Sequence, residues 1–203
     1  MNLLQINSYS IASGLYKNLY RKLDSKNVNQ SIFVPFQNNS EKRKNYVELK
    51  NGDFIYKNTF NTVDRILYFT KIKKSYSSLL ENIDLNDIDI AHAHSLFVNG
   101  GIANELYKEH NIDFITAVRN TDLNLFFGKM IHLRKKGLEI LKNALKIVFI
   151  SPAYKKRLIE ECIPKKLKSE IEQKAIIIPN GINNYWLGNL NLNKKKTKGL
   201  SKT

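Results

Sequence analysis

The stretch IDIAHAHSLFVNGGIANELYKEHNIDFITAVRNTD, residues 88–122, decides how this chain is built. An apolar run ends at the His-Ala-His of residues 92–94, and the Gly-Gly of residues 100–101 then opens a segment with helical apolar spacing. A second apolar run, residues 114–118, leads into the Arg-Asn-Thr-Asp of residues 119–122. The pattern predicts strand, helix, strand. In an open parallel sheet it brings both polar clusters to the carboxyl edge, where ligands bind.

The rest of the chain repeats this alternation of strands and helices. Short apolar runs predict strands at residues 2–7, 31–36, 147–150 and 175–178. Apolar positions at helical spacing predict helices within residues 15–23, 61–83, 123–144 and 152–162. The order predicts an α/β fold, Rossmann-like and doubly wound, with a mostly parallel sheet and helices on both faces.

Three local signals refine this outline. Asn51-Gly52, between two short apolar runs, is typical of a type I′ turn and predicts a β-hairpin insertion near residues 45–57. Gly137 is expected to break the helical segment that follows Asp122. Ser151 stands directly before a proline, which is typical of an N-cap and favours that role over a nucleophile.

Composition limits the classes of protein to consider. The chain has 203 residues, with 42% hydrophobic and 25% charged, as is ordinary for a globular protein with one substantial core. The single cysteine, Cys162, excludes an internal disulfide framework. No apolar run approaches the roughly 20 residues of a membrane span, and the first residues lack the features of a secretory signal. A cytoplasmic location is expected, peripheral at the inner face of the membrane.

Charge is the outlier, because the formal net charge is +15. Such a charge favours an anionic partner, but a Lys-, Asn- and Ile-rich composition also accompanies A/T-rich coding, so charge alone decides nothing. Residues 126–136 alternate apolar and basic side chains. This segment is either an amphipathic helix that lies on an anionic membrane or a helix that packs its apolar face on the core and exposes its basic face to solvent.

Four motifs, in this order, resemble the N-terminal domain of GT-B glycosyltransferases of the family-4-like retaining type. They are HAHSLFVNGG (92–101), AVRNTD (117–122), FISPAY (149–154) and IIIPNGI (176–182). The resemblance implies an acceptor-side domain at residues 1–182, with Asn180 and Gly181 at the hinge to a second domain. Residues 183–203 are then a hinge remnant and a Lys-rich, disordered tail.

The resemblance also implies an activity. Such an enzyme transfers a sugar from a nucleoside-diphosphate sugar to a glycan or lipid-linked acceptor in polysaccharide or glycoconjugate biosynthesis. It needs no metal or other cofactor. Its second domain binds most of the donor, so residues 1–203 alone are expected to be inactive and a separately encoded C-terminal domain is an expected partner. An anionic membrane surface is a further expected partner, whereas nucleic acid is not favoured.

The candidate site residues come from this resemblance and from their positions at the ends of the predicted strands. His94 matches the family histidine beside the scissile bond and is the candidate catalytic residue. The loop that holds Ser13 and Gly14 matches the one that approaches donor phosphate and acceptor. Arg119 suits a phosphate or carboxylate, because its planar fork binds either. Asn120 and Thr121 supply further polar contacts. Asp122 either orients an acceptor hydroxyl or caps the following helix.

Three other interpretations stay open. His92 and His94 point the same way and could form a metal pair, but the ligands this would need are not apparent, since His110 and His132 fall on predicted helices. Gly100 and Gly101 need only allow close packing of helix on sheet. In a second class of function, the chain is a non-catalytic doubly wound binding module that uses its basic surface for nucleic acid or an anionic membrane.

Overall fold

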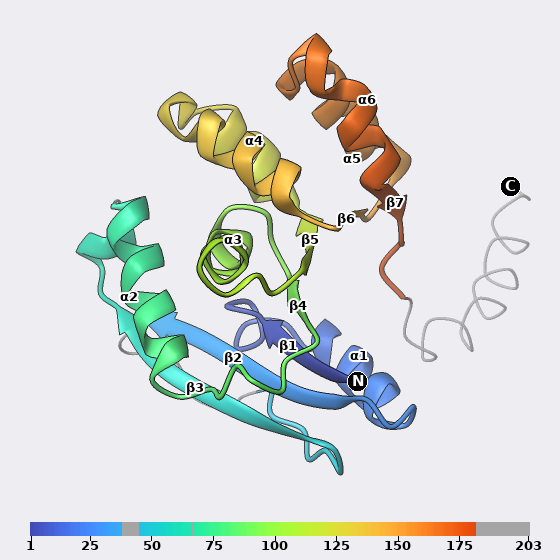
Figure 1. Ribbon diagram of the computed structural model, residues 1–203. Helices are drawn as coiled ribbons and strands as arrows, with labels where there is room; N and C mark the ends of the chain where they lie inside the picture. Colours follow the sequence, from blue (N-terminus) through green and yellow to red (C-terminus); the bar gives the residue numbers. More distant parts are fainter. Residues whose placement is uncertain (38–44, 66, 182–203) are drawn as a thin grey trace, which may run out of the picture.

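Seven strands form one parallel sheet in the computed structural model, which describes residues 1–37, 45–65 and 67–181 (Figure 1). The strand order is β3-β2-β1-β4-β5-β6-β7, and every paired strand runs parallel to its neighbour. The strands are β1 (Asn2–Ile6), β2 (Asn29–Gln37), β3 (Gly52–Phe60), β4 (Ile90–Ala93), β5 (Phe114–Val118), β6 (Lys146–Phe149) and β7 (Ala175–Ile177). The predicted Rossmann-like α/β class is confirmed.

Helices cover the two faces of this sheet unequally. The longer helices are α1 (Leu15–Asp24), α2 (Tyr68–Leu80), α3 (Val98–His110), α4 (Arg134–Asn143) and α6 (Lys165–Lys174). Shorter turns are η1 (Val63–Arg65), η2 (Asp122–Phe127), η3 (Ile131–Leu133), α5 (Pro152–Arg157) and η4 (Leu158–Cys162). Residues of α2, α3, α4 and α6 share one large core, whereas α1 packs into a small second core. Right-handed crossovers explain why α1 and α2 lie on opposite faces of the sheet. The chain moves toward one edge of the sheet from β1 to β2, and toward the other edge from β3 to β4.

The predicted hairpin at residues 45–57 is wrong. β3 runs parallel to β2 along nine residues, and no described glycine has a positive φ, so Asn51-Gly52 is not a type I′ turn. The Asp24 carboxylate instead accepts hydrogen bonds from the backbone N–H groups of Lys50 (3.1 Å) and Asn51 (2.8 Å). A Cβ on Gly52 would lie 2.7 Å from the carbonyl oxygen of Gln30. The glycine is therefore needed for close approach of the two strands.

Gly137 does not break a helix, as the sequence had predicted, but lies inside α4. The break falls earlier, around Gly128, between the π-helical turn η2 and the 3₁₀ turn η3. A Cβ on Gly137 would lie 2.5 Å from Cζ of Phe97 and 2.9 Å from Cζ of Phe127. Its role is to let α4 approach two buried aromatic rings.

Replacement of Gly137 by alanine is therefore expected to lower the free energy of unfolding by up to about 2 kcal/mol. Overpacking costs about 1–3 kcal/mol, which outweighs the gain of about 1 kcal/mol in helix propensity. Urea unfolding followed by circular dichroism measures the change. Gly14→Ala is the control, because a Cβ there meets only Oδ1 of Asn45, at 3.7 Å. Equal effects of the two substitutions would contradict the prediction.

The basic segment at residues 126–136 is not one helix. It runs from η2 through a short connection and η3 into α4. Phe126, Phe127 and Leu133 belong to the large core, while the side chains of Lys129 and Lys135 are exposed. The structure thus favours a segment whose apolar residues pack in the core and whose basic residues face solvent over a single amphipathic membrane helix. Among the described residues, no helix has the length and apolar character needed to cross a membrane.

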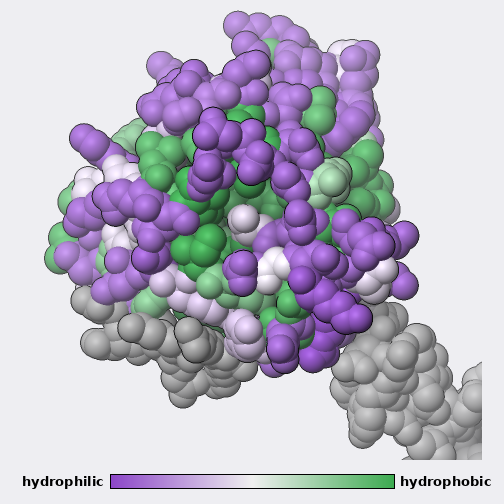
Figure 2. Space-filling view, turned by 60° about the horizontal axis from the view of Figure 1, so that its bottom comes forward, coloured by the Kyte–Doolittle hydropathy of each residue, from purple (hydrophilic) through white to green (hydrophobic). Residues whose placement is uncertain are grey.

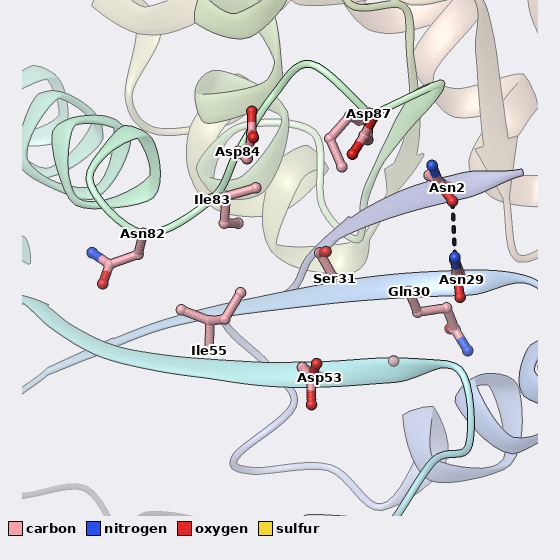
Figure 3. A pocket seen from close by; sticks show the side chains of 12 residues that line it. Asn2, Asn29, Gln30, Ser31, Asp53, Ile55, Asn82, Ile83, Asp84 and Asp87 are labelled. Atoms are coloured by element: carbon pink, nitrogen blue, oxygen red, sulfur yellow. Dashed lines mark hydrogen bonds between the residues drawn. The ribbon is translucent and has the colours of Figure 1, made fainter.

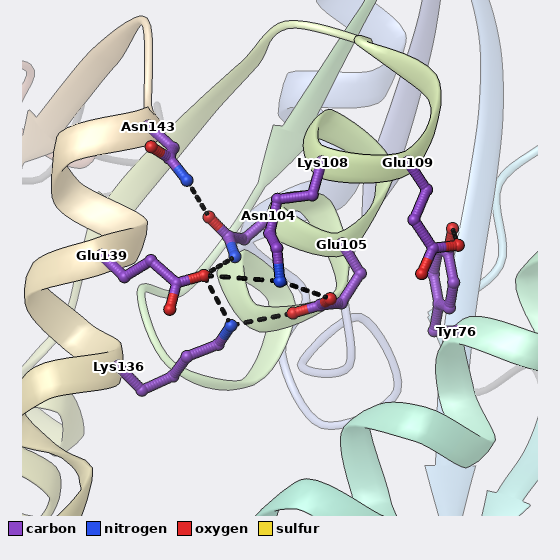
Figure 4. Close-up of polar contacts among 8 residues, drawn as sticks. All are labelled: Tyr76, Asn104, Glu105, Lys108, Glu109, Lys136, Glu139 and Asn143. Carbon is purple, nitrogen blue, oxygen red and sulfur yellow. Dashed lines mark hydrogen bonds and ion pairs between the residues drawn. The ribbon is translucent and has the colours of Figure 1, made fainter.

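A polar cluster fixes α4 against α3 (Figure 4). Lys136 Nζ lies 2.8 Å from Glu105 and 2.9 Å from Glu139, and its side chain is only 13% exposed. Burial opposes ionisation of Glu105, but hydrogen bonds and charge from Lys136 and Lys108 outweigh it and lower the pKa of Glu105. Asn104 donates to Glu139 at 2.8 Å and completes the cluster. The cluster orients the helix that follows β4 and hence the strand end before it.

Surface chemistry varies across the side of the molecule that lies at the bottom of Figure 1. Apolar residues gather near the middle of that side, within a rim of hydrophilic ones (Figure 2). Ile115, Val148 and Ile176 on β5, β6 and β7 are only partly buried.

The predicted hinge remnant and tail, residues 183–203, lie outside the described part of the chain.

Candidate functional site

A cavity of about 230 Å³ lies at the carboxyl ends of β4, β5, β6 and β7. Tyr16 and Leu19 of α1 form one wall. His94, Arg119 and Asn180 reach it from the ends of three different strands, which is the placement that an open parallel sheet predicts for a ligand site. The structure therefore brings the candidate catalytic residue, the candidate anion ligand and the predicted hinge into one cavity.

His94 is almost fully buried at the end of β4, with 1% of its surface exposed. Its Nε2 lies 2.8 Å from Oε1 of Gln5, and its ring centroid lies 4.1 Å from that of His92 and 5.0 Å from that of Tyr16. Burial, together with His92 and Arg119, holds the pKa of His94 well below its ordinary value. The ring is therefore neutral at neutral pH and acts as a hydrogen-bonding group, not as a cation.

His92 lies beneath His94 on the same face of β4. Burial and the charge of Arg119 lower the pKa of His92 to about 4. Two neutral imidazoles therefore line this cavity beside one permanent positive charge.

Arg119, just past β5, is half-buried. Its Nε donates to the backbone carbonyl oxygen of His94 at 3.0 Å. That contact fixes the guanidinium beside the histidine and leaves the two terminal nitrogens for another acceptor. Arg119 is the permanently charged residue among the described residues that line the cavity. The cavity is thus suited to an anionic group next to a neutral imidazole.

Asp122 is buried behind Arg119 and binds backbone. Its carboxylate accepts hydrogen bonds from the N–H groups of Leu96 (3.1 Å), Phe97 (3.1 Å) and Arg119 (2.8 Å). Burial raises the pKa of Asp122 to about 6, although the three N–H groups act in the opposite direction. Asp122 thus stabilises the residues that enter α3, a different helix from the one predicted. Its contact with an acceptor hydroxyl stays a prediction.

The other predicted contacts lie around this cavity, not in its lining. Ser13 Oγ accepts from the backbone N–H of Leu15 at 3.4 Å, and Gly14 precedes the first turn of α1. Asn120 Oδ1 accepts from Asn124 at 2.5 Å and is exposed. Thr121 lines a second cavity of about 400 Å³, which also lies at the carboxyl edge. Gly181, by contrast, lines the first cavity with His94.

Two residues of the site escaped the sequence interpretation. Gln5 is fully buried in β1 and contacts His94, and Tyr16 packs its ring against the same histidine. A glutamine inside an apolar strand was the available signal for the first. The other histidines, His110 and His132, are exposed on α3 and η3. Within the described ranges, no three His, Cys, Asp or Glu side chains gather as metal ligands.

A third cavity, of about 380 Å³, lies at the opposite edge of the sheet (Figure 3). Its lining includes Asp53, Asp84 and Asp87, and Asn29 donates to Asn2 across the start of two strands at 3.1 Å. Three carboxylates would repel a diphosphate or another anion. The charge of Arg119 therefore favours the carboxyl-edge cavity for an anionic ligand.

Comparisons with known proteins bear on the fold. No protein-family model matches the sequence, and no curated protein matches it. A solved structure of sucrose-phosphate synthase from Thermosynechococcus elongatus matches with a TM-score of 0.63 over 97% of this chain and 99% of that one. The two sequences are 14% identical, so the likeness concerns the fold. It confirms the predicted Rossmann-like fold with a parallel sheet.

Proposed function

We propose that this chain is the acceptor-side domain of a retaining glycosyltransferase, with its substrate site at the cavity around His94. The complete reaction would move a sugar from a nucleoside-diphosphate sugar to a hydroxyl of a glycan or lipid-linked acceptor. Residues 1–182 would form the domain, with Asn180 and Gly181 at its hinge. The observation that carries the proposal is the pairing of neutral His94 with Arg119 in one carboxyl-edge cavity.

The chemistry of the cavity fits the two parts of a nucleotide-sugar. A sugar offers hydroxyl groups, which a neutral imidazole can bind without repelling a neighbouring cation. A diphosphate offers anionic oxygens, which suit the terminal nitrogens of Arg119. Because the guanidinium is fixed to the carbonyl of His94, the two groups are held at a constant spacing. Such positioning of preorganised donors is the main way in which a protein stabilises a departing diphosphate.

Saturation-transfer NMR with UDP-glucose, GDP-mannose and methyl glucoside tests the proposal on the full chain. Arg119→Ala is expected to weaken binding of a nucleotide-sugar by about tenfold to a hundredfold, since a charge-assisted hydrogen bond contributes about 1.5–3 kcal/mol. His94→Ala should weaken the sugar contacts of both ligand types.

Arg134→Ala is the matched control for Arg119→Ala. Arg134 also donates through Nε to a backbone carbonyl, that of Phe127 at 2.7 Å, but it does not line the cavity. Equal loss of binding in both arginine variants, or no binding by the wild type, would overturn the proposal. Salt-dependent binding of RNA or anionic vesicles that survives Arg119→Ala and His94→Ala would instead support a non-catalytic module.

A further inference from the structure

A row of buried hydrogen bonds leads from the candidate catalytic histidine to the backbone of α1. His94 Nε2 lies 2.8 Å from Gln5 Oε1, and Gln5 Nε2 donates to Gln30 Oε1 at 3.2 Å. Gln30 Nε2 in turn donates to the backbone carbonyl oxygen of Tyr20 at 3.0 Å. Gln5 is 0% exposed and Gln30 is 3% exposed. Water therefore does not compete for these groups.

The backbone carbonyl of Tyr20 decides which group donates and which accepts in each of these hydrogen bonds. A backbone carbonyl oxygen can only accept, so Gln30 must turn its NH₂ group toward Tyr20 and its oxygen toward Gln5. Gln5 must then donate through its own NH₂ group and present its oxygen to His94. An oxygen at that position can only accept, so the proton of the imidazole lies on Nε2.

We propose that Gln5 and Gln30 are positioning residues that hold His94 as the Nε2–H tautomer. Nδ1 then keeps its lone pair, and the described residues give it no hydrogen-bond partner. On the proposed function, on which this step rests, Nδ1 selects a ligand group that donates, such as a sugar hydroxyl. Phosphate oxygens, which accept, are directed to Arg119. His94, held in this tautomer by the two glutamines, thus binds the sugar, and Arg119 binds the diphosphate.

The opposite orientation of the two glutamine amides is unfavourable because of the Tyr20 carbonyl. If both glutamines turned over, the side-chain oxygen of Gln30 would face the carbonyl oxygen of Tyr20 at the present 3.0 Å separation. The carbonyl of Tyr20 belongs to α1 and cannot turn without unwinding that helix. In a buried site two facing acceptors have no water to relieve them. A helix carbonyl therefore sets the tautomer of a histidine that lies two side chains away.

Long-range ¹⁵N–¹H NMR of the four histidine rings tests the inference on the full chain. In the wild type, Nε2 of His94 is expected at the protonated nitrogen shift and Nδ1 at the unprotonated one. Gln5→Met removes the acceptor and Gln30→Met removes the fixed end. Both substitutions should move the two shifts toward each other as the tautomers mix. His92→Gln, His110→Gln and His132→Gln assign the signals.

Asn104→Leu is the matched control, because Asn104 is a fully buried amide whose partners, Glu139 and Asn143, lie in a separate cluster. It should leave the His94 shifts unchanged. An Nδ1–H tautomer in the wild type overturns the inference, and that measurement needs no variant to fold. Shifts that stay fixed in folded Gln5→Met would also overturn it.

The ligand titration separates the inference from the proposed function. Methyl glucoside should perturb Nδ1 of wild-type His94 and should do so more weakly in Gln30→Met. An Nε2–H tautomer that depends on Gln5, in a protein that binds no sugar or nucleotide-sugar, would uphold the positioning role of the glutamines. It would overturn the glycosyltransferase proposal and the hydroxyl selection that rests on it.

Discussion

Replacement of Asp122 by asparagine should lower the free energy of unfolding by about 2 kcal/mol, because even in its better orientation the amide leaves the buried N–H of Phe97 facing an NH₂ group. The carboxylate accepts from Leu96, Phe97 and Arg119, and it is 1% exposed. Asparagine has nearly the same shape but only one acceptor oxygen. Urea unfolding at about pH 7.5 measures the loss. Ionisation of Asp122 is then largely complete, since burial raises its pKa only to about 6.

Asp113→Asn is the control for Asp122→Asn, because Asp113 is exposed immediately before β5. It should change stability by less than about 0.5 kcal/mol. The larger effect at Asp122 should extend to the cavity, since its carboxylate ties the backbone of Arg119 to the residues just beyond His94. A loss below about 1 kcal/mol in Asp122→Asn would mean that the three backbone contacts contribute little.

Acid should weaken the fold through His92. Burial and Arg119 lower the pKa of His92 to about 4, so below about pH 6.5 the unfolded chain takes up a proton that the folded chain does not. The stability from neutral His92 is therefore complete above about pH 6.5 and is lost as the pH falls toward 4. Between about pH 7.5 and pH 5 the loss should be about 2 kcal/mol.

The difference in unfolding free energy between wild type and His92→Gln measures this effect together with the part of the lowered pKa of His94 that His92 causes. Asp122 titrates in the opposite sense, because its raised pKa makes the folded chain take up a proton between about pH 4 and pH 6. That contribution is common to both proteins and cancels in the difference. Parallel curves for wild type and His92→Gln would refute the role of His92.

Periodicity was enough to predict the sheet, and sheet geometry was enough to join His94 to Arg119. Both depend on local patterns, because apolar runs separated by helical spacing make parallel strands whose ends meet at one edge. The hairpin prediction failed because its signal was equally local. Asn51-Gly52 is typical of a tight turn, but the strand that follows is the edge strand of the sheet and pairs in parallel with β2.

What the sequence could not give were partners that lie far along the chain. Gln5 reaches His94 across 89 positions, and Gln30 reaches Gln5 across 25. Asp122 binds the N–H groups of Leu96 and Phe97, just before a helix that precedes it in the chain, whereas its spacing indicates a helix that follows. The packing role of Gly137 depends on the ring of Phe97, forty positions away, which no local rule connects to it.

The first strand of the chain lies inside the sheet, between β2 and β4, and this has a consequence for synthesis. β1 pairs with β2 on one side and with β4 on the other, and Asn2 donates to Asp89. When β2 leaves the ribosome, β1 can gain only one neighbour, and its other edge stays unpaired until β4 follows. The nascent chain therefore carries an open strand edge through the synthesis of β3 and α2, an interval in which chaperone binding would be most effective.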